Sequence, residues 1–247
     1  MKFFNSFRRK ILGSDFGKYL LYAFGEIVLV VIGILLAISI NDHYAKDDRA
    51  QKSLESTRKI YQQMQVDSME VTLYIKYLDE LRSTVKYLIA SEEDRAKNKL
   101  KKPLSAVSRL ELFMDRDSDY INLSNLVAIQ IQNGDFSSTN YAQLLFNIQV
   151  DYSNDLRAIY DQEDVIQDNN KRFNSYLADN YQWYLEWSSN LNCNQDCMKF
   201  IRSDSRFNGM LALYSYEKTV IYQQRLEGFR DNLKLNMSKL RQVLNQK

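Results

Sequence analysis

The chain has 247 residues, including one proline, seven glycines and two cysteines, and its formal net charge is only +2. Folds built from strands and tight turns need more glycine and proline, and two cysteines cannot staple a scaffold of this size. Hydrophobic residues make up 45% of the chain, which excludes wholesale disorder and leaves a largely α-helical protein as the expected fold class.

The basic charge is concentrated at the N-terminus. Residues 1–18 carry five basic side chains and one acidic side chain, a net charge of +4. A nucleic-acid-binding protein usually spreads a basic face over its folded domain, so we expect no nucleic-acid partner. We interpret residues 1–18 as a short basic tail.

An apolar segment of 22 residues, Tyr19–Ile40, follows the tail and contains one charged residue, Glu26. A helix of this length spans about 33 Å, enough to cross a hydrocarbon core of roughly 30 Å. A signal peptide is the competing interpretation, because Ala37-Ile38-Ser39 loosely resembles a cleavage site. The apolar run is longer than the roughly 7–15 residues of a signal peptide, so we expect an uncleaved transmembrane helix over residues 19–40.

The charges on either side of this segment predict its orientation. Lysine and arginine precede it, whereas three aspartates follow it closely: Asp42, Asp47 and Asp48. The positive-inside rule then places the N-terminus in the cytoplasm and the residues after the segment outside. We expect a bacterial inner-membrane protein whose residues 41–247 lie in the periplasm.

Helical periodicity near 3.6 residues continues through residues 41–247. A charged stretch, residues 91–102, ends at Pro103 and is expected to be a loop. Helices are expected over residues 41–90, 120–132, 139–187, 197–202 and 206–243. The apolar stripe of the last helix includes Met210, Leu213, Val220, Leu226 and Phe229. We expect one antiparallel helical bundle, with the transmembrane helix continuing into it as a stalk.

Glu26 is costly to place against lipid and therefore indicates a function. At about 100° per residue, Gly33 and Ala37 lie close to Glu26 on one helix face, together with Tyr22. The small pair Gly33-x-x-x-Ala37 lets helices approach closely, which suggests a packing face in a homo-oligomer or a larger membrane-protein complex. Two alternatives remain: a proton or ion site at Glu26, or a carboxylate that reaches the headgroups beside the basic tail.

Cys193 and Cys197 are separated by three residues. In an oxidising compartment they can form a local disulfide, provided that they lie in a loop, since this spacing on a regular helix gives poor geometry. Free thiols are the alternative. The sole histidine is His43, at the membrane edge, so neither a zinc site nor a catalytic thiol is expected.

Four aromatic residues cluster near the end of the long third helix: Tyr181, Trp183, Tyr184 and Trp187. They are candidates for a ligand pocket or a surface that faces a partner. Aromatic residues at helical spacing are more often core or interface filler, and this alternative stays open.

The sequence contains no P-loop, Gly-x-Gly-x-x-Gly, Gly-x-Ser-x-Gly, His-Glu-x-x-His or paired Cys-x-x-Cys motif. We therefore expect no enzymatic activity, no catalytic residues, no cofactor and no bound metal.

The block Lys18–Ile27, followed by Val30–Ile34, resembles the opening of an uncharacterised Bacteroidota family of N-terminally membrane-anchored helical periplasmic proteins. Phe24 stands where that family has an aliphatic residue. The stretch of residues 120–136 is similar to a turn between two helices in the same family, with Asn133-Gly134 at the turn. The resemblance implies the anchor and the helical domain, and it implies no activity.

These features predict a non-enzymatic assembly or accessory subunit that contacts membrane lipid and packs on itself or on a partner membrane protein. The alternative is a sensor or ligand-binding module that signals through a partner, with its small-molecule ligand unknown.

Overall fold

The structure is a computed structural model that describes residues 15–99, 120, 121, 123, 125–134, 136, 139–190 and 192–245. These residues form helices and connecting segments and contain no strand, which confirms the all-α prediction. The chain divides into two compact units, Met1–Leu54 and Glu55–Lys247, which we call the first and the second unit. Most of the predicted basic tail, residues 1–14, lies outside the described residues.

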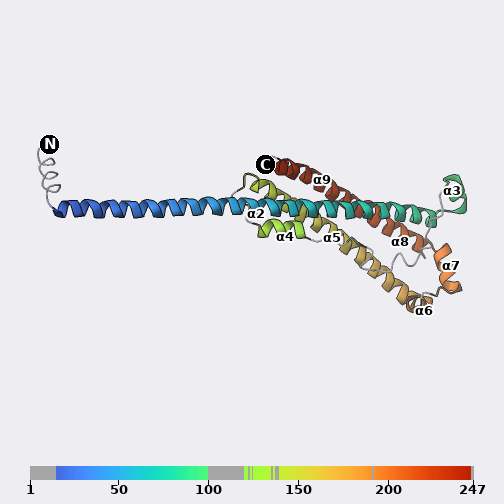
Figure 1. Ribbon diagram of the computed structural model, residues 1–247. Helices are drawn as coiled ribbons and strands as arrows, with labels where there is room; N and C mark the ends of the chain where they lie inside the picture. Colours follow the sequence, from blue (N-terminus) through green and yellow to red (C-terminus); the bar gives the residue numbers. More distant parts are fainter. Residues whose placement is uncertain are drawn as a thin grey trace, which may run out of the picture. The chain divides into compact units, whose positions relative to one another are not determined.

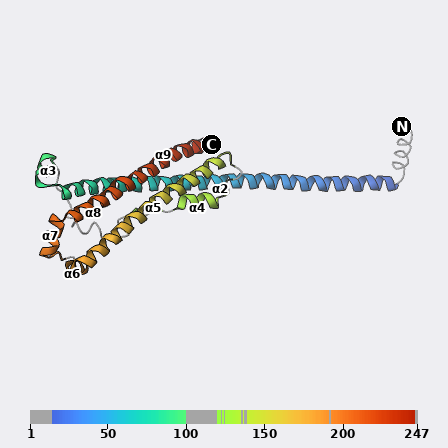
Figure 2. The same cartoon turned by 180° about the vertical axis from the view of Figure 1, so that it is seen from behind.

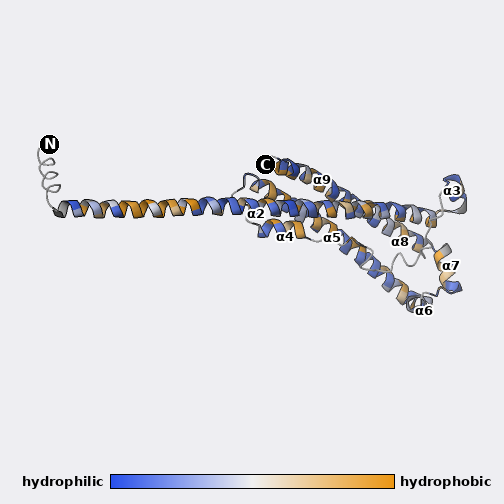
Figure 3. Cartoon of the chain, in the orientation of Figure 1, coloured by the Kyte–Doolittle hydropathy of each residue, from blue (hydrophilic) through white to orange (hydrophobic). Residues whose placement is uncertain are grey.

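The described part of the first unit is the beginning of helix α2 (Asp15–Ile89). It contains a segment that is long and apolar enough to cross a membrane. Figure 3 shows this segment as a nearly continuous hydrophobic band along α2. Its large side chains are exposed, for example Ile27 at 62%, Leu29 at 73% and Leu35 at 60%. No residue described in the first unit covers this apolar surface.

The second unit contains the rest of α2 and eight further described helical segments, which Figures 1 and 2 show from two sides. They are α3 (Glu92–Lys97), α4 (Leu126–Asn133), α5 (Ala142–Asn180), α6 (Gln182–Asn190), α7 (Gln195–Ser203), α8 (Ser205–Tyr216), the π-helix η3 (Glu217–Tyr222) and α9 (Gln223–Asn245).

Helices α2 and α5 run in the same direction within the second unit. Thr57 on α2 donates a hydrogen bond to the Tyr141 hydroxyl at 3.3 Å, one residue before α5 begins. Further along both helices, the Tyr152 hydroxyl donates to Asp67 at 2.5 Å. This parallel pair differs from the expected antiparallel bundle, because the start of α5 lies beside Thr57 rather than beside the end of α2.

Helix α9 runs in the opposite direction to α2. The Arg82 guanidinium donates to Gln223 Oε1 at 3.2 Å, at the start of α9. Near the other end of α9, Arg241 Nη2 donates to the Tyr61 hydroxyl at 2.6 Å. In both views α5 and α9 cross the later part of α2 obliquely, and α5 diverges from it toward α6.

Apolar side chains from these helices form one core. The residues that α2 contributes recur at helical spacing: Ile60, Met64, Val71, Ile75, Leu78, Leu81 and Val85. Helix α5 contributes a matching set: Leu145, Ile148, Tyr152, Leu156, Ile159, Ile166, Phe173 and Leu177. Burying one such side chain stabilises the fold by about 1.5–3 kcal/mol, so this stripe holds the second unit together.

Several helix boundaries differ from the predictions. The predicted helix 120–132 begins only at Leu126, and the predicted helix 139–187 is interrupted at Tyr181, whose backbone is extended. The gap between the predicted helices 139–187 and 197–202 is shorter than expected, because α6 continues to Asn190 and α7 begins at Gln195. Within the predicted loop 91–102, α3 forms a short helix, and Pro103 lies outside the described residues.

Candidate functional site

The predicted packing face lies on α2 in the first unit. Tyr22 is 75% exposed, and Glu26, Gly33 and Ala37 are exposed as well. A Cβ atom added to Gly33 would meet no described atom within 4 Å. Among the described residues, nothing therefore packs on Gly33 of this face.

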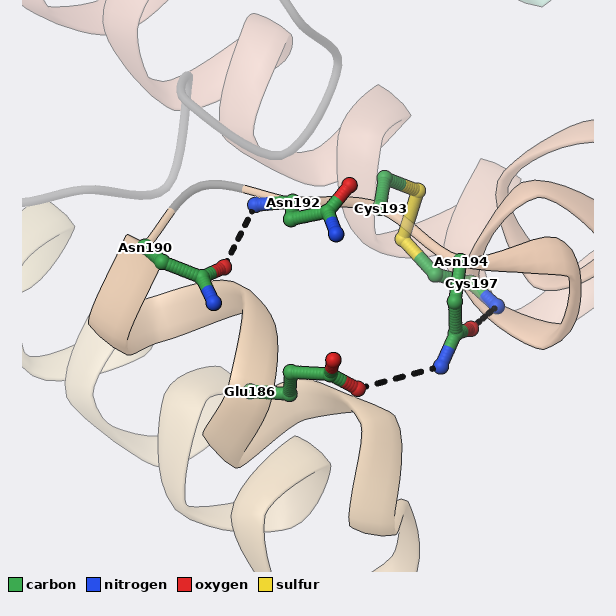
Figure 4. Close-up of a disulfide and its surroundings, with 6 residues drawn as sticks. All are labelled: Glu186, Asn190, Asn192, Cys193, Asn194 and Cys197. Atoms are coloured by element: carbon green, nitrogen blue, oxygen red, sulfur yellow. Dashed lines mark hydrogen bonds between the residues drawn. A yellow bond between two sulfur atoms is a disulfide. The ribbon is translucent and has the colours of Figure 1, made fainter.

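A disulfide joins Cys193 and Cys197, with their Cα atoms 5.3 Å apart (Figure 4). Cys193 precedes α7, and Cys197 lies in its first turn, so the pair does not occupy one regular helix. Between them, Asn194 caps α7 by accepting a hydrogen bond from the Cys197 backbone N–H at 3.1 Å. Asn194 also donates to Glu186 on α6 at 3.4 Å, which ties the disulfide loop to that helix.

The aromatic cluster belongs mostly to the core. Trp183, Tyr184 and Trp187 are buried, and Tyr181 is partly buried. The ring centroids of Tyr181 and Phe200 lie 4.6 Å apart, and those of Trp183 and Phe200 lie 5.3 Å apart. These contacts fasten α6 to α7.

A cleft of about 670 Å³ lies beside this cluster. Its lining is Asn180, Tyr181, Gln182, Trp183, Glu186, Asn194, Asp196, Lys199, Phe200 and Asp204. The volume is that of a typical small-molecule site, and the aromatic residues supply an apolar wall beneath polar groups. Two of the four predicted aromatic residues, Tyr181 and Trp183, therefore line the cleft.

A second candidate site surrounds the π-helix η3, which the sequence did not reveal. Helix η3 and the first residue of α9 place five polar or amphipathic side chains in the core: Glu217, Lys218, Thr219, Tyr222 and Gln223. Lysine and glutamate are rarely buried unless they are paired. Because π-helices occur frequently at functional sites, this concentration of buried polar groups marks η3 as a candidate site.

Lys218 is only 1% exposed, and its ammonium lies over the rings of Tyr120 and Tyr214, at 4.4 and 5.5 Å from their centroids. Such cation–π contacts stabilise a desolvated cation. Nearby, the Tyr222 hydroxyl donates a hydrogen bond to Glu163 on α5. Burial raises the pKa of the Glu163 carboxyl, while the Tyr222 hydrogen bond and the Lys218 charge oppose the rise. Burial likewise raises the pKa of the Tyr222 hydroxyl.

The other side of η3 is hydrogen-bonded to α2. Arg82 donates to the Thr219 hydroxyl at 3.3 Å and to Gln223 Oε1 at 3.2 Å. The Gln223 amide in turn donates to Asp79 and to Glu227, each at 3.0 Å. These bonds fix η3 between α2 and α5.

One sequence signal for the π-helix exists. Tyr214, Lys218, Tyr222 and Leu226 follow one another at intervals of four residues, and all four are buried. On an α-helix a spacing of four drifts by about 40° per step, so three such steps would leave the core. The wider turn of the π-helix absorbs this drift and keeps all four positions inward.

A third buried polar group lies between α2 and α5. Asp67 is 1% exposed and accepts hydrogen bonds from the Tyr152 hydroxyl at 2.5 Å and from the Gln63 amide at 2.8 Å. Burial raises the pKa of Asp67, and the two hydrogen bonds oppose that rise.

The described residues contain no group of three or more histidine, cysteine, aspartate or glutamate side chains that could hold a metal ion. Comparison with protein families, with curated proteins and with solved structures finds no match to this chain. The function must therefore be argued from the apolar segment, the disulfide and the buried polar groups.

Proposed function

We propose that this protein is a non-enzymatic, single-pass membrane protein that acts as an assembly or accessory subunit. The observation that carries the proposal is the apolar surface of α2 in the first unit, whose large side chains are exposed. A contiguous apolar surface of this length needs lipid or other helices around it. A helix satisfies its own backbone hydrogen bonds and is thus suited to that environment.

The orientation that we propose places the second unit outside the cytoplasm, in the periplasm of a bacterium. The Cys193–Cys197 disulfide supports this side, because disulfides persist in oxidising compartments. The excess of basic residues before the apolar segment supports the same orientation.

The partner that we propose is a second transmembrane helix, from another copy of the chain or from a larger membrane protein. Gly33 and Ala37 leave room for close approach, and Glu26 would exchange a costly lipid environment for hydrogen bonds at the helix–helix contact. Tyr22 lies on the same face and would fill the contact nearer the headgroups.

Membrane extraction and protease protection test the topology. We expect the full-length chain to stay in the membrane pellet after alkaline carbonate treatment. We also expect protease added outside spheroplasts to digest the second unit. Release by carbonate, or protection of the second unit in intact spheroplasts, would contradict the proposal.

The assembly role needs a second experiment. We expect the protein solubilised in mild detergent to have a mass above that of one 29.2 kDa chain plus its micelle, or to co-purify with a membrane protein. A monomer that co-purifies with no partner would contradict the assembly role without affecting the proposed topology.

A second candidate function is ligand binding by the second unit, with the signal passed to a partner. The cleft beside Tyr181 and Trp183 favours it, because polar side chains there converge on an aromatic wall. If this cleft binds the ligand, substituting Lys199 and Asp196 by alanine should abolish ligand binding to the second unit and leave the mass of the detergent-solubilised complex unchanged.

A further inference from the structure

A small cavity of about 180 Å³ lies between α5 and α8, next to η3. Its lining is Asn169, Asn170, Arg172, Phe173, Met210, Leu213, Tyr214 and Glu217. Arg172 and Leu213 are exposed and form its rim, whereas Asn170, Phe173, Tyr214 and Glu217 are buried. The cavity has room for about six water volumes or one small organic molecule.

Glu217 contributes an unsatisfied group to this cavity wall. Its side chain is 9% exposed, and Oε1 accepts a hydrogen bond from the Asn169 amide at 2.7 Å. The other carboxylate oxygen, Oε2, is buried and has no hydrogen-bond partner among the described residues. Leaving a buried acceptor without a donor costs about 1–3 kcal/mol, and more for a charged group. A donor that enters the cavity would recover this free energy.

The lining selects the kind of donor. A carboxylate forms its strongest hydrogen bonds with a positively charged N–H group. The ring of Phe173 presents apolar and π-electron surface, which suits a cation with a short hydrocarbon portion, and the Tyr214 ring, which Lys218 already contacts, adds apolar surface. The amides of Asn169 and Asn170 add polar groups that can orient a second N–H.

We propose that this cavity is a binding site for a small molecule bearing a protonated primary amine, with the Glu217 carboxylate as its anchor. Lys218 does not occupy this role in the structure, since its ammonium lies over the rings of Tyr120 and Tyr214. The site is separate from the cleft at α6 and α7, and it does not depend on membrane assembly.

Two classes of molecule carry such an amine, simple alkylamines and α-amino acids, and they differ in whether they would contact Arg172. A simple alkylamine needs Glu217 alone. An α-amino acid would also place its carboxylate against the guanidinium at the cavity rim, since arginine is suited to carboxylates. The two sources share the same ammonium contact with Glu217.

Isothermal titration calorimetry on the full-length protein in detergent tests the site, with n-butylamine and the uncharged 1-butanol as matched probes. We expect n-butylamine to bind and 1-butanol not to bind. Glu217→Gln keeps the shape and the acceptor for Asn169 but removes the charge, so we expect it to weaken n-butylamine binding at least about tenfold. Glu80→Gln, an exposed glutamate on α2, serves as the control and should leave binding unchanged.

A second variant guards against a local folding defect at Glu217. Leu213→Trp enlarges an exposed rim residue without touching the carboxylate, and it should also abolish n-butylamine binding by blocking the cavity. Equal binding of both probes, unchanged binding by Glu217→Gln, or no heat from n-butylamine, as for a cavity that holds only water, would overturn the proposal.

A further titration identifies the source once n-butylamine binds. If L-2-aminobutyrate binds more tightly than n-butylamine and Arg172→Ala removes that advantage, the site takes α-amino acids. If L-2-aminobutyrate gains nothing, the site takes simple amines, and both results support the ammonium site at Glu217.

Discussion

Asp67 shows how a single buried carboxylate can shape the stability of the second unit. It is 1% exposed, and the groups that face it are the Tyr152 hydroxyl on α5 and the Gln63 amide on its own helix. Neither partner carries a formal charge. Burial therefore dominates and raises the Asp67 pKa above its ordinary value of 3.8.

The raised pKa predicts how stability depends on pH. The folded state binds a proton at Asp67 more tightly than the unfolded state, so ionised Asp67 lowers stability at neutral pH. As pH falls through the folded pKa toward 3.8, the wild type should gain stability relative to Asp67→Asn, which cannot ionise. Urea unfolding of both proteins between neutral and acidic pH measures this difference. If the free energy of unfolding of the wild type, relative to that of Asp67→Asn, stays constant or falls as the pH falls, the assignment is refuted.

The hydrogen bond from Tyr152 provides a second test at the same position. Tyr152→Phe removes one of the two donors to a buried carboxylate and should destabilise the second unit by roughly 1–3 kcal/mol. Tyr216→Phe is a matched control, because Tyr216 is 55% exposed, and its effect should stay within about 0.5 kcal/mol. Urea denaturation compares the two, and equal effects would contradict the role of the Tyr152 hydroxyl.

At the scale of elements, the π-helix η3 connects two helices whose inward faces are out of phase. Buried positions before η3 and after it cannot belong to one straight α-helical stripe, because the π-helix shifts the phase by about 100°, or one residue. Deleting the half-exposed Val220 should let the segment become α-helical while both stripes still face the core. We expect the deletion to lower the free energy of unfolding by about 1–3 kcal/mol, because it disrupts the polar contacts around η3.

Inserting one alanine after Val220 is the opposite change. It turns the buried stripe of α9 by about a further 100° and exposes core side chains such as Leu226 and Phe229. We expect this insertion to lower the free energy of unfolding by more than about 4 kcal/mol, a larger loss than the deletion of Val220 causes. Equal free energies of unfolding for the two variants, measured in urea, would show that η3 does not set the phase.

The disulfide is the other element with a measurable contribution. Non-reduced, denatured protein should show no free thiol, since both cysteines are bonded in the structure. Replacing Cys193 and Cys197 by serine opens a loop of only a few residues. For such a short loop the loss of chain entropy in the unfolded state corresponds to about 2 kcal/mol, so we expect the free energy of unfolding to fall by about that amount. Reduced wild type should match the double variant. Two titratable thiols before reduction would contradict the disulfide.

The helices were largely predictable from the sequence, and their interruptions were not. Periodicity near 3.6 located the long helices. The gap predicted between the helices 197–202 and 206–243 is present but is confined to Asp204, which caps α8 by accepting a hydrogen bond from the Phe207 backbone N–H. The break at Tyr181 has no glycine or proline to mark it; it lets α6 pack its aromatic residues on α7. Local propensity does not encode such a tertiary contact.

The predicted stripe of the last helix is correct for Leu226 and Phe229, which are 0% and 1% exposed, and wrong at two positions for a related reason. Leu213 and Val220 were expected to face inward, but they are 50% and 40% exposed. A single period drawn through η3 selects the wrong face, because it omits the phase shift. The buried positions there include Lys218 and Glu217, which a search for apolar residues passes over.

At the scale of the whole molecule, the exposed face of Glu26, Gly33 and Ala37 predicts how assembly responds to substitution. Glu26→Ala removes the hydrogen-bonding group and should shift the detergent-solubilised protein toward the monomer, whereas Glu26→Gln should retain the larger species. Val28→Ala lies on the opposite face and serves as the control. Light scattering in detergent measures the mass. If neither Glu26 variant changes it or the recovery of partners, this face is not the contact.

The location of the two tryptophans has a practical consequence for all these measurements. The chain has only Trp183 and Trp187, both buried on α6 beside the disulfide loop. Intrinsic tryptophan fluorescence therefore reports the local environment of α6, whereas far-ultraviolet circular dichroism follows the helices of the entire chain. Coincident transitions by the two signals would mean that α6 unfolds together with the rest of the second unit. An earlier fluorescence transition would identify α6 as an independently opening segment.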